Sequence, residues 1–300
     1  MPARRSTLAC AVAVATALPV AALPASSAAA TESGTSAAAV SGPYVALGDS
    51  YASAAGVPGQ SAGLCLRSDR NYPSVLARQA GFTGVRDVTC AAAKTKHMTE
   101  AQIYPVIGTV NAPQLNAVTA DTRLVTLTIG GNDLGASDLG VAEVILKCVS
   151  LSFVSPLGAP CKRSYGTTLD GRIASAGSGV ASTVREIRRR APQAKIMVVG
   201  YPAVLPENEW DCLFKQPITV YDAAFLRTTV KRLNRTLARQ AEANGATFVD
   251  TYTPTIGHDI CQDPEDRWIE GILPRDPAVP IHPNARGERA MAEATLAALR

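Results

Sequence analysis

Short apolar runs alternate with longer stretches of mixed apolar and polar positions along most of the chain. Five of these runs are rich in Val, Ile, Leu or Thr, as buried parallel strands are. They lie at residues 43–47, 85–89, 123–129, 195–200 and 246–250. Helices are expected at about 71–80, 111–118, 138–151, 167–191, 222–244 and 285–299. The alternation predicts an α/β fold of three layers, α/β/α and flavodoxin-like, with a mainly parallel central sheet of about five strands.

Two of the expected helices begin at recognisable sequence signals. The fifth opens with Asp222, a residue suited to cap a helix N-terminus, and the last begins after Pro283 and Asn284. A basic run from Arg185 to Arg190 falls at the end of the fourth. Positive charges there complement the helix dipole, so we expect this run to close a helix rather than to bind phosphate.

The first 30 residues have the pattern of a secretory signal peptide. Arg4 and Arg5 give a positive start. A stretch rich in Ala, Val and Leu then runs from Leu8 to Leu23, and three alanines end at Ala30, as at a cleavage site. A retained membrane anchor is less favoured, because the apolar stretch is short and rich in alanine. We therefore expect a secreted protein without a stable membrane anchor.

The rest of the chain is expected to form one domain after a short leader. Residues 31–42 are rich in Ser, Ala, Gly and Thr and predict a flexible mature N-terminus. Residues 43–300 are long enough for a single large α/β core. The formal net charge of +4 falls by two, to +2, when Arg4 and Arg5 are removed. Such a nearly neutral chain predicts no nucleic-acid partner.

Three polar residues with complementary chemistry lie at strand ends or before the last helix. Ser50 ends Gly-Asp-Ser after the first strand, Asn132 lies in Gly-Gly-Asn-Asp after the third, and His282 opens His-Pro-Asn. A serine hydroxyl needs a positioned base to act as a nucleophile at neutral pH. In parallel sheets the ligand crevice lies at the carboxyl ends of the strands. These residues predict a nucleophile, an oxyanion donor and a general base at one edge of the sheet.

The three blocks, in this order, resemble the SGNH hydrolase superfamily, also called the GDSL esterases and lipases. The spelling is most similar to the secreted actinobacterial lipase and esterase branch, and the resemblance covers residues 43–300. The chain has no Gly-x-Ser-x-Gly elbow of the α/β-hydrolase lipases. The resemblance implies a secreted serine hydrolase that cleaves carboxylic esters of acyl lipids through an acyl-serine intermediate. It implies Ser50 as nucleophile, His282 as base, Asn132 as oxyanion donor, and neither metal nor organic cofactor.

The residue that orients the histidine departs from the family pattern. Members usually carry an aspartate three residues before the histidine, and here that position is Val279. Some members use a serine–histidine dyad in which a backbone carbonyl accepts the imidazole N–H. The carbonyl of Val279 is the candidate, and a carbonyl can fix the tautomer although it stabilises the imidazolium less than a carboxylate does. The alternative is that Asp276 reaches the imidazole.

The backbone part of the oxyanion hole also departs from the family pattern. The resemblance implies donors from the N–H of Ser50 and from a residue shortly after the second strand, where members often have glycine. Ala92 stands at that place, with Ala91 as the alternative. Only an N–H is required, so alanine serves readily if its φ is negative, and at a cost if the turn needs a positive φ.

Six cysteines follow the expected signal peptide. An even number in an exported chain predicts three disulfides. The resemblance implies sequential pairing, Cys65–Cys90, Cys148–Cys161 and Cys212–Cys261. A zinc site is the competing interpretation, and it is disfavoured because no Cys-x-x-Cys pair is present and the histidines are scattered.

The substrate class stays open at this level. A small-molecule or lipid ester is expected, and the aromatic content of 5% favours acyl chains over sugar rings. The loop-rich stretches 148–166 and 202–220 are candidate walls of the acyl pocket. A carbohydrate or phospholipid esterase is one alternative, and a non-catalytic exported binding protein of the same fold is another. We expect a monomer.

Overall fold

The computed structural model describes residues 41–300 of the chain. The expected signal peptide, and all but the last two residues of the expected flexible N-terminus, lie outside the described residues. Five parallel strands form the central sheet in the order β2-β1-β5-β6-β7. Their bounds are β1 Tyr44–Gly48, β2 Val85–Asp87, β5 Leu124–Thr128, β6 Lys195–Val199 and β7 Thr247–Val249. The five predicted strands and the parallel sheet are confirmed.

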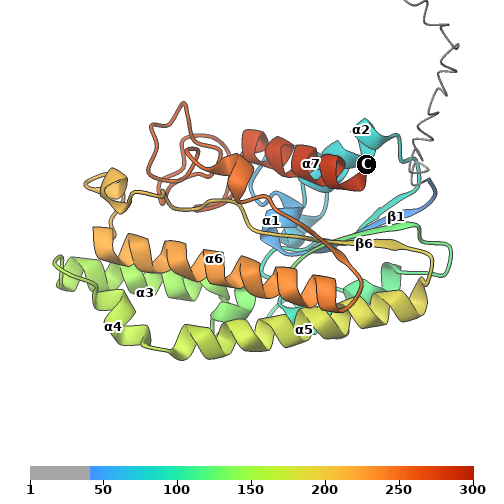
Figure 1. The fold of residues 1–300 in the computed structure, drawn as a ribbon, viewed down its shortest axis with the longest axis horizontal. Coiled ribbons are helices and arrows are strands. Elements are labelled where there is room, and N and C mark those ends of the chain that lie inside the picture. The colour runs from blue at the N-terminus through green and yellow to red at the C-terminus, as the bar shows by residue number, and fades with distance from the viewer. Residues whose placement is uncertain (1–40) are drawn as a thin grey trace, which may run out of the picture. The chain divides into compact units, whose positions relative to one another are not determined.

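Helices cover both faces of this sheet (Figure 1). On one face α2 packs against α7, and on the other α5 packs against α6, with α3 and α4 at the N-terminal end of α6. Their bounds are α2 Tyr72–Ala80, α3 Val141–Val154, α4 Pro160–Tyr165, α5 Thr168–Arg190, α6 Val220–Ala243 and α7 Ala285–Leu299. The three-layer α/β/α architecture predicted from the alternation is therefore confirmed.

The central strands are mostly apolar and almost entirely buried because both faces of the sheet are covered. All five residues of β1 are buried, and successive side chains point to opposite faces. Val45 and Leu47 join the core beneath α5 and α6. Tyr44 and Ala46 join the smaller core beneath α2 and α7. One strand thus contributes to two cores.

The helix expected at 111–118 does not form. This segment instead begins in β4 (Gly108–Asn111), which pairs with β3 (Gln102–Tyr104) as an antiparallel hairpin, and continues into a short 3₁₀ helix, Gln114–Ala117. Pro113 explains the difference, because a proline disfavours helical backbone at the residue before it, here Ala112. Helical structure therefore begins only after Pro113.

The cap of α6 also differs from the expectation. The capping residue is Thr219, whose side chain accepts a hydrogen bond from the N–H of Asp222. The Asp222 carboxylate instead accepts hydrogen bonds from the N–H groups of Cys161 and Lys162, both at 3.0 Å. It therefore caps the N-terminus of α4. Two other expected helix ends are confirmed. Asn284 caps the N-terminus of α7, and the basic run lies at the C-terminal end of α5.

Three disulfides join the cysteines in sequential order, as the resemblance implies. They are Cys65–Cys90, Cys148–Cys161 and Cys212–Cys261. The first lies beside the end of β1, since the N–H of Cys90 donates to Gly48 O at 3.0 Å.

Candidate active site

The turn after β1 presents Ser50 at the edge of the sheet. Gly48 ends the strand with a φ of +157°, and an added Cβ would lie 2.7 Å from both Ala52 Cβ and Thr128 O. Only glycine fits there. The short helix α1 (Ser50–Ser53) then begins, and Asp49 caps it by accepting from the N–H of Tyr51 at 3.0 Å. Asp49 therefore stabilises the turn that carries Ser50.

A buried glutamine, which the sequence reasoning missed, fixes the strand end. The Gly48 N–H donates to Gln114 Oε1 at 2.8 Å, and Gln114 Nε2 donates back to the Gly48 carbonyl at 2.9 Å. The N–H of Cys90 donates to the same carbonyl at 3.0 Å. The backbone just before Ser50 is therefore held from three directions. No local sequence signal marks Gln114, because its partner lies far away in the chain.

Ser50 and His282 are joined by a hydrogen bond although they lie 232 residues apart in the sequence. The Ser50 hydroxyl lies 2.7 Å from His282 Nε2, and His282 Nδ1 lies 2.8 Å from the carbonyl oxygen of Pro280. A carbonyl can only accept, so Nδ1 carries the proton and Nε2 is left to accept from the serine. This is the tautomer that a general base requires.

The prediction that the Val279 carbonyl orients His282 is wrong, because the carbonyl of the next residue, Pro280, takes that place. Ile281 has a φ of +62°, and this left-handed turn bends the chain so that the Pro280 carbonyl faces the imidazole of His282. Val279 is held elsewhere, since its N–H donates to Ala55 O at 2.9 Å. A backbone carbonyl does orient the histidine, as predicted, but a different one.

The alternative that Asp276 reaches the imidazole is also wrong. Its carboxylate pairs with the Arg286 guanidinium at 3.0 Å. Among residues 41–300, no carboxylate pairs with His282. Burial therefore lowers the pKa of His282 to about 4, with the Pro280 carbonyl acting weakly in the opposite direction. The imidazole is neutral at pH 7 and free to accept a proton.

Asn132 faces the turn after β2. Its Nδ2 donates to Ala93 O at 3.0 Å, and its Oδ1 accepts from the N–H of Val141 at 3.3 Å. These two bonds fix which end of the amide is the donor, and they leave the second Nδ2 hydrogen for another acceptor. The neighbouring Asp133 accepts hydrogen bonds from the N–H and hydroxyl of Thr95 at 3.0 and 2.6 Å, so it links the two loops.

The turn beside Asn132 distinguishes the two alanine candidates. The Ala91 N–H donates to Cys65 O at 2.9 Å and is therefore occupied. The N–H groups of Ala92 and Ser50 donate no hydrogen bond within residues 41–300. Ala92 has a φ of +61°, so the favourable case of a negative φ does not hold. The chain accepts a strained alanine where glycine fits at lower cost.

Two tyrosines that the sequence reasoning missed tie the motifs together. The Tyr201 hydroxyl donates to Asp49 Oδ2 at 2.6 Å and accepts from the Gly131 N–H at 2.7 Å, so it links the ends of β1, β5 and β6. The Tyr51 hydroxyl donates to Ile281 O at 2.6 Å and so joins α1, which carries Ser50, to the loop that carries His282. Burial raises the pKa of Asp49 to about 7. In the sequence, only their positions point to the site, since Tyr51 directly follows Ser50 and Tyr201 lies just after β6.

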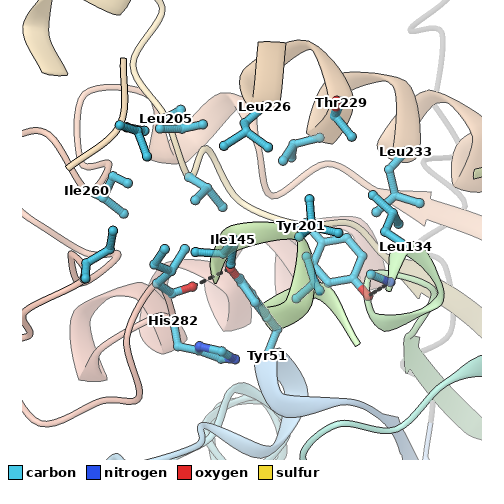
Figure 2. A pocket seen from close by; sticks show the side chains of 18 residues that line it. Tyr51, Leu134, Ile145, Tyr201, Leu205, Leu226, Thr229, Leu233, Ile260 and His282 are labelled. Carbon is cyan, nitrogen blue, oxygen red and sulfur yellow. Dashed lines mark hydrogen bonds between the residues drawn. The ribbon is translucent and has the colours of Figure 1, made fainter. Parts of the chain in front are cut away.

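An apolar cavity of about 90 Å³ opens beside His282 (Figure 2). Tyr51, Tyr201 and His282 supply polar groups at one end, and the remaining lining is almost entirely aliphatic. As expected, the stretch 202–220 contributes to its wall. The stretch 148–166 does not, because it is largely helical, and the first turns of α3 and the middle of α6 take its place.

No group of three or more His, Cys, Asp or Glu side chains within residues 41–300 is arranged to hold a metal ion. In the same part of the chain, no helix combines the length and the apolar character needed to cross a bilayer.

A parallel α/β sheet with a serine–histidine pair at its carboxyl edge and an apolar cavity beside it defines a class of ester hydrolases. Residues 46–290 match the GDSL-like lipase/acylhydrolase family, and the chain belongs to that family. It is a carboxylic ester hydrolase of the lipase and esterase type, as the resemblance implies.

Several lipases and esterases of Streptomyces are similar to this chain in sequence or in structure. Lipase 2 of Streptomyces coelicolor is 43% identical over 84% of this chain and 84% of its own length. An esterase of Streptomyces scabiei is 31% identical over 77% of this chain and 75% of its own. The extracellular lipase of Streptomyces rimosus is similar in structure, with a TM-score of 0.66 at 26% identity, over 86% of this chain and 100% of its own. Phospholipase A1 of Streptomyces albidoflavus has a TM-score of 0.65 at 26% identity, over 86% and 98%.

Proposed function

We propose that this protein is a secreted serine hydrolase that cleaves carboxylic esters of acyl lipids through an acyl-enzyme formed on Ser50. The observation that carries the proposal is the 2.7 Å hydrogen bond between the Ser50 hydroxyl and His282 Nε2. A nucleophile within hydrogen-bond reach of a base, which is itself oriented by a third group, is the signature of covalent acyl transfer.

The first half-reaction forms the acyl-enzyme. His282 Nε2 accepts the proton as Ser50 Oγ attacks the ester carbonyl carbon. The Pro280 carbonyl holds Nδ1–H in place, and it supports the imidazolium less than a carboxylate does. The negative carbonyl oxygen accepts hydrogen bonds from the N–H groups of Ser50 and Ala92 and from Asn132 Nδ2. The first half-reaction ends when the imidazolium gives its proton to the leaving alcohol oxygen as the carbon–oxygen bond breaks, which leaves the acyl group on Ser50.

The second half-reaction releases the acid. Water then attacks the acyl carbon, giving its proton to Nε2. Collapse of the second tetrahedral intermediate regenerates the Ser50 hydroxyl and frees the carboxylic acid.

The acyl chain is assigned to the apolar cavity. His282 lines the cavity, as does Tyr51, the residue after Ser50, and the lining is almost free of polar surface. Burial of methylene groups there contributes about 0.8 kcal/mol for each one. This lining favours acyl lipids over the acetyl groups of carbohydrates. Phospholipid esters form a second candidate substrate, favoured by the similarity to phospholipase A1 of Streptomyces albidoflavus.

The organisation of the chain supports export. We propose that residues 1–30 are a cleaved signal peptide and that residues 43–300 form a single catalytic domain, active as a monomer. Three disulfides suit an oxidising compartment, and the similar lipase of Streptomyces rimosus is extracellular.

Hydrolysis of p-nitrophenyl esters from acetate to palmitate tests the proposal. Ser50→Ala is expected to reduce turnover by about 10⁴-fold or more with every ester. Ser53→Ala, a buried serine in the same helix, is the control and is expected to keep most of the activity. Equal rates in wild type and Ser50→Ala would exclude Ser50 as the nucleophile. The chain-length profile separates an esterase from a lipase.

A further inference from the structure

An exposed groove lies between the C-terminal end of α3 and the N-terminal end of α6, and we call it the apolar groove. Its walls come from α3 and the loop after it, from the loop around Cys212, and from the start of α6. Phe153 is 74% exposed, Leu157 81% and Phe214 97%. Soluble monomers rarely expose contiguous apolar surface of this kind unless it meets a partner.

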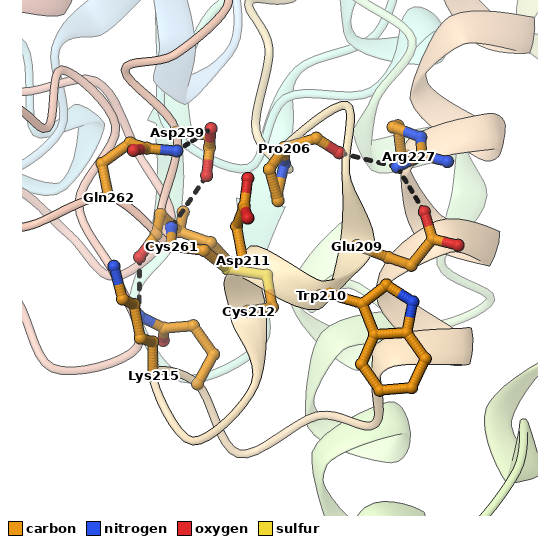
Figure 3. Close-up of a disulfide and its surroundings, with 12 residues drawn as sticks. Pro206, Glu209, Trp210, Asp211, Cys212, Lys215, Arg227, Asp259, Cys261 and Gln262 are labelled. Carbon is orange, nitrogen blue, oxygen red and sulfur yellow. Dashed lines mark hydrogen bonds and ion pairs between the residues drawn. A yellow bond between two sulfur atoms is a disulfide. The ribbon is translucent and has the colours of Figure 1, made fainter.

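The loop around Cys212 exposes Trp210 by 55% and Phe214 by 97%. Cys212, which lies between them in the sequence, is bonded to Cys261 (Figure 3). The buried Gln216 side chain makes hydrogen bonds of 2.7 and 3.1 Å to two backbone groups. Phe214 has a φ of +61°, which is costly for a bulky residue. A strained phenylalanine that packs against nothing adds no stability to the fold, so its exposure points to a contact outside the chain.

The apolar groove adjoins the cavity beside His282. Ile218 lines both. On α3, Ile145 lines the cavity, and Phe153, two turns later, lines the groove. On α6, Tyr221 lines the groove and Leu226 lines the cavity. The same two helices therefore contribute to both, and Ile218 lies where the groove and the cavity meet.

The charge around the groove selects the kind of partner. None of the fourteen described residues that line it is acidic or basic. In the neighbouring loop, Lys215 pairs with Asp263 at 3.2 Å and Glu209 with Arg227 of α6 at 3.1 Å. The Asp211 carboxylate of the same loop accepts a hydrogen bond from Asn208 Nδ2 at 3.0 Å. An uncharged apolar partner fits this surface better than a strongly charged one.

We propose that the apolar groove docks this protein onto the surface of aggregated, uncharged or zwitterionic lipid. This inference rests on the proposed function, because it gives an acyl-ester substrate a route to Ser50. Aromatic side chains are favoured at the boundary between water and hydrocarbon. Docking places the Ile218 end of the cavity against hydrocarbon, so an acyl chain enters without crossing water.

Vesicle binding tests the docking surface directly. The purified protein is sedimented with vesicles of diether phosphatidylcholine, which contains no carboxylic ester and is not consumed. Phe153→Ser combined with Phe214→Ser is expected to lower partitioning by about tenfold or more, since each phenylalanine loses apolar burial in the lipid. Hydrolysis of dissolved p-nitrophenyl butyrate by the same variant is expected to stay within about twofold of wild type.

A matched control and a second measurement keep the outcomes distinct. Val106→Ser combined with Ile107→Ser removes two exposed apolar residues, 97% and 60% exposed, from the β3–β4 hairpin, and is expected to partition like wild type. Equal partitioning of the groove variant and wild type, or an equal loss in the hairpin variant, overturns the docking surface. So does a wild-type dimer in sedimentation velocity that becomes a monomer in the groove variant. Absence of p-nitrophenyl butyrate hydrolysis in wild type contradicts the proposed function instead.

Discussion

His282 Nδ1 lies 2.8 Å from the carbonyl oxygen of Pro280, two residues earlier in the chain. The imidazole that we propose as the base is thus oriented by its own loop rather than by a separate acidic side chain. Burial lowers the pKa of His282 to about 4, and the hydrogen bond to the Pro280 carbonyl opposes this shift only in part. The geometry of the pair depends on the left-handed turn at Ile281.

The pH dependence of kcat/KM reports the low pKa of His282. The neutral imidazole is the active form and is present above its pKa, which burial lowers to about 4 from the usual 6.5. We therefore expect kcat/KM for p-nitrophenyl butyrate to be flat from neutral pH down to about pH 5 and to fall below it. A midpoint near the ordinary histidine pKa would show that His282 is solvated as in water.

Removing the Asp276 carboxylate tests whether any acid supports the histidine. The ion pair between Asp276 and Arg286 is partly exposed, and such pairs contribute at most about 1 kcal/mol. Asp276→Asn should therefore keep kcat within about twofold and change the free energy of unfolding by less than about 1 kcal/mol. A loss of two orders of magnitude in kcat would instead show that the carboxylate acts on His282.

Glycine at position 92 should relieve the strained turn of the oxyanion hole. Ala92 has a φ of +61°, so Ala92→Gly is expected to raise the free energy of unfolding by about 1 kcal/mol, with activity retained. Ala91→Gly is the control, since Ala91 is not among the residues of positive φ, and it should destabilise by about 0.5–1 kcal/mol. Urea denaturation measures both, and equal effects would contradict the strain argument.

The Tyr201 hydroxyl should matter for stability and for turnover. Tyr201→Phe leaves Asp49 Oδ2 and the Gly131 N–H without the partner that joins them, at a cost of about 1–3 kcal/mol for buried unpaired groups. We also expect a lower kcat, because Asp49 and Gly131 adjoin Ser50 and Asn132. Tyr221→Phe, at an exposed tyrosine, should leave both quantities unchanged. Similar values for the two variants would show that the network is dispensable.

A larger side chain in the cavity should change the preferred chain length. Ile145 lines the cavity, so Ile145→Phe is expected to lower kcat/KM for palmitate about tenfold relative to butyrate, as filled pocket volume excludes methylenes. The adjacent Leu146 is 59% exposed, and Leu146→Phe should leave the ratio unchanged. An unaltered ratio in Ile145→Phe would mean that the acyl chain lies elsewhere.

The sequence by itself determined the sheet and the polar groups at its edge. Buried parallel strands need unbroken apolar runs, and a strand end followed by Gly-Asp-Ser or Gly-Gly-Asn-Asp is a local signal. The pairing of the cysteines followed from the family resemblance rather than from geometry. Pro113 shows the limit of periodicity, since one proline replaced an expected helix by a hairpin end and a 3₁₀ turn.

Only the tertiary structure decided how the site is held. Whether the carbonyl of Val279 or of Pro280 meets His282 depends on the sign of φ at Ile281, which the spacing does not encode. Gln114 and Tyr201 act on partners 66 and 70 residues away or more, so no local pattern marks them. The cavity walls were equally hidden, because the residues that face it depend on how α3 and α6 pack. Strand ends are set by local chemistry, whereas contacts between distant segments exist only once the chain has folded.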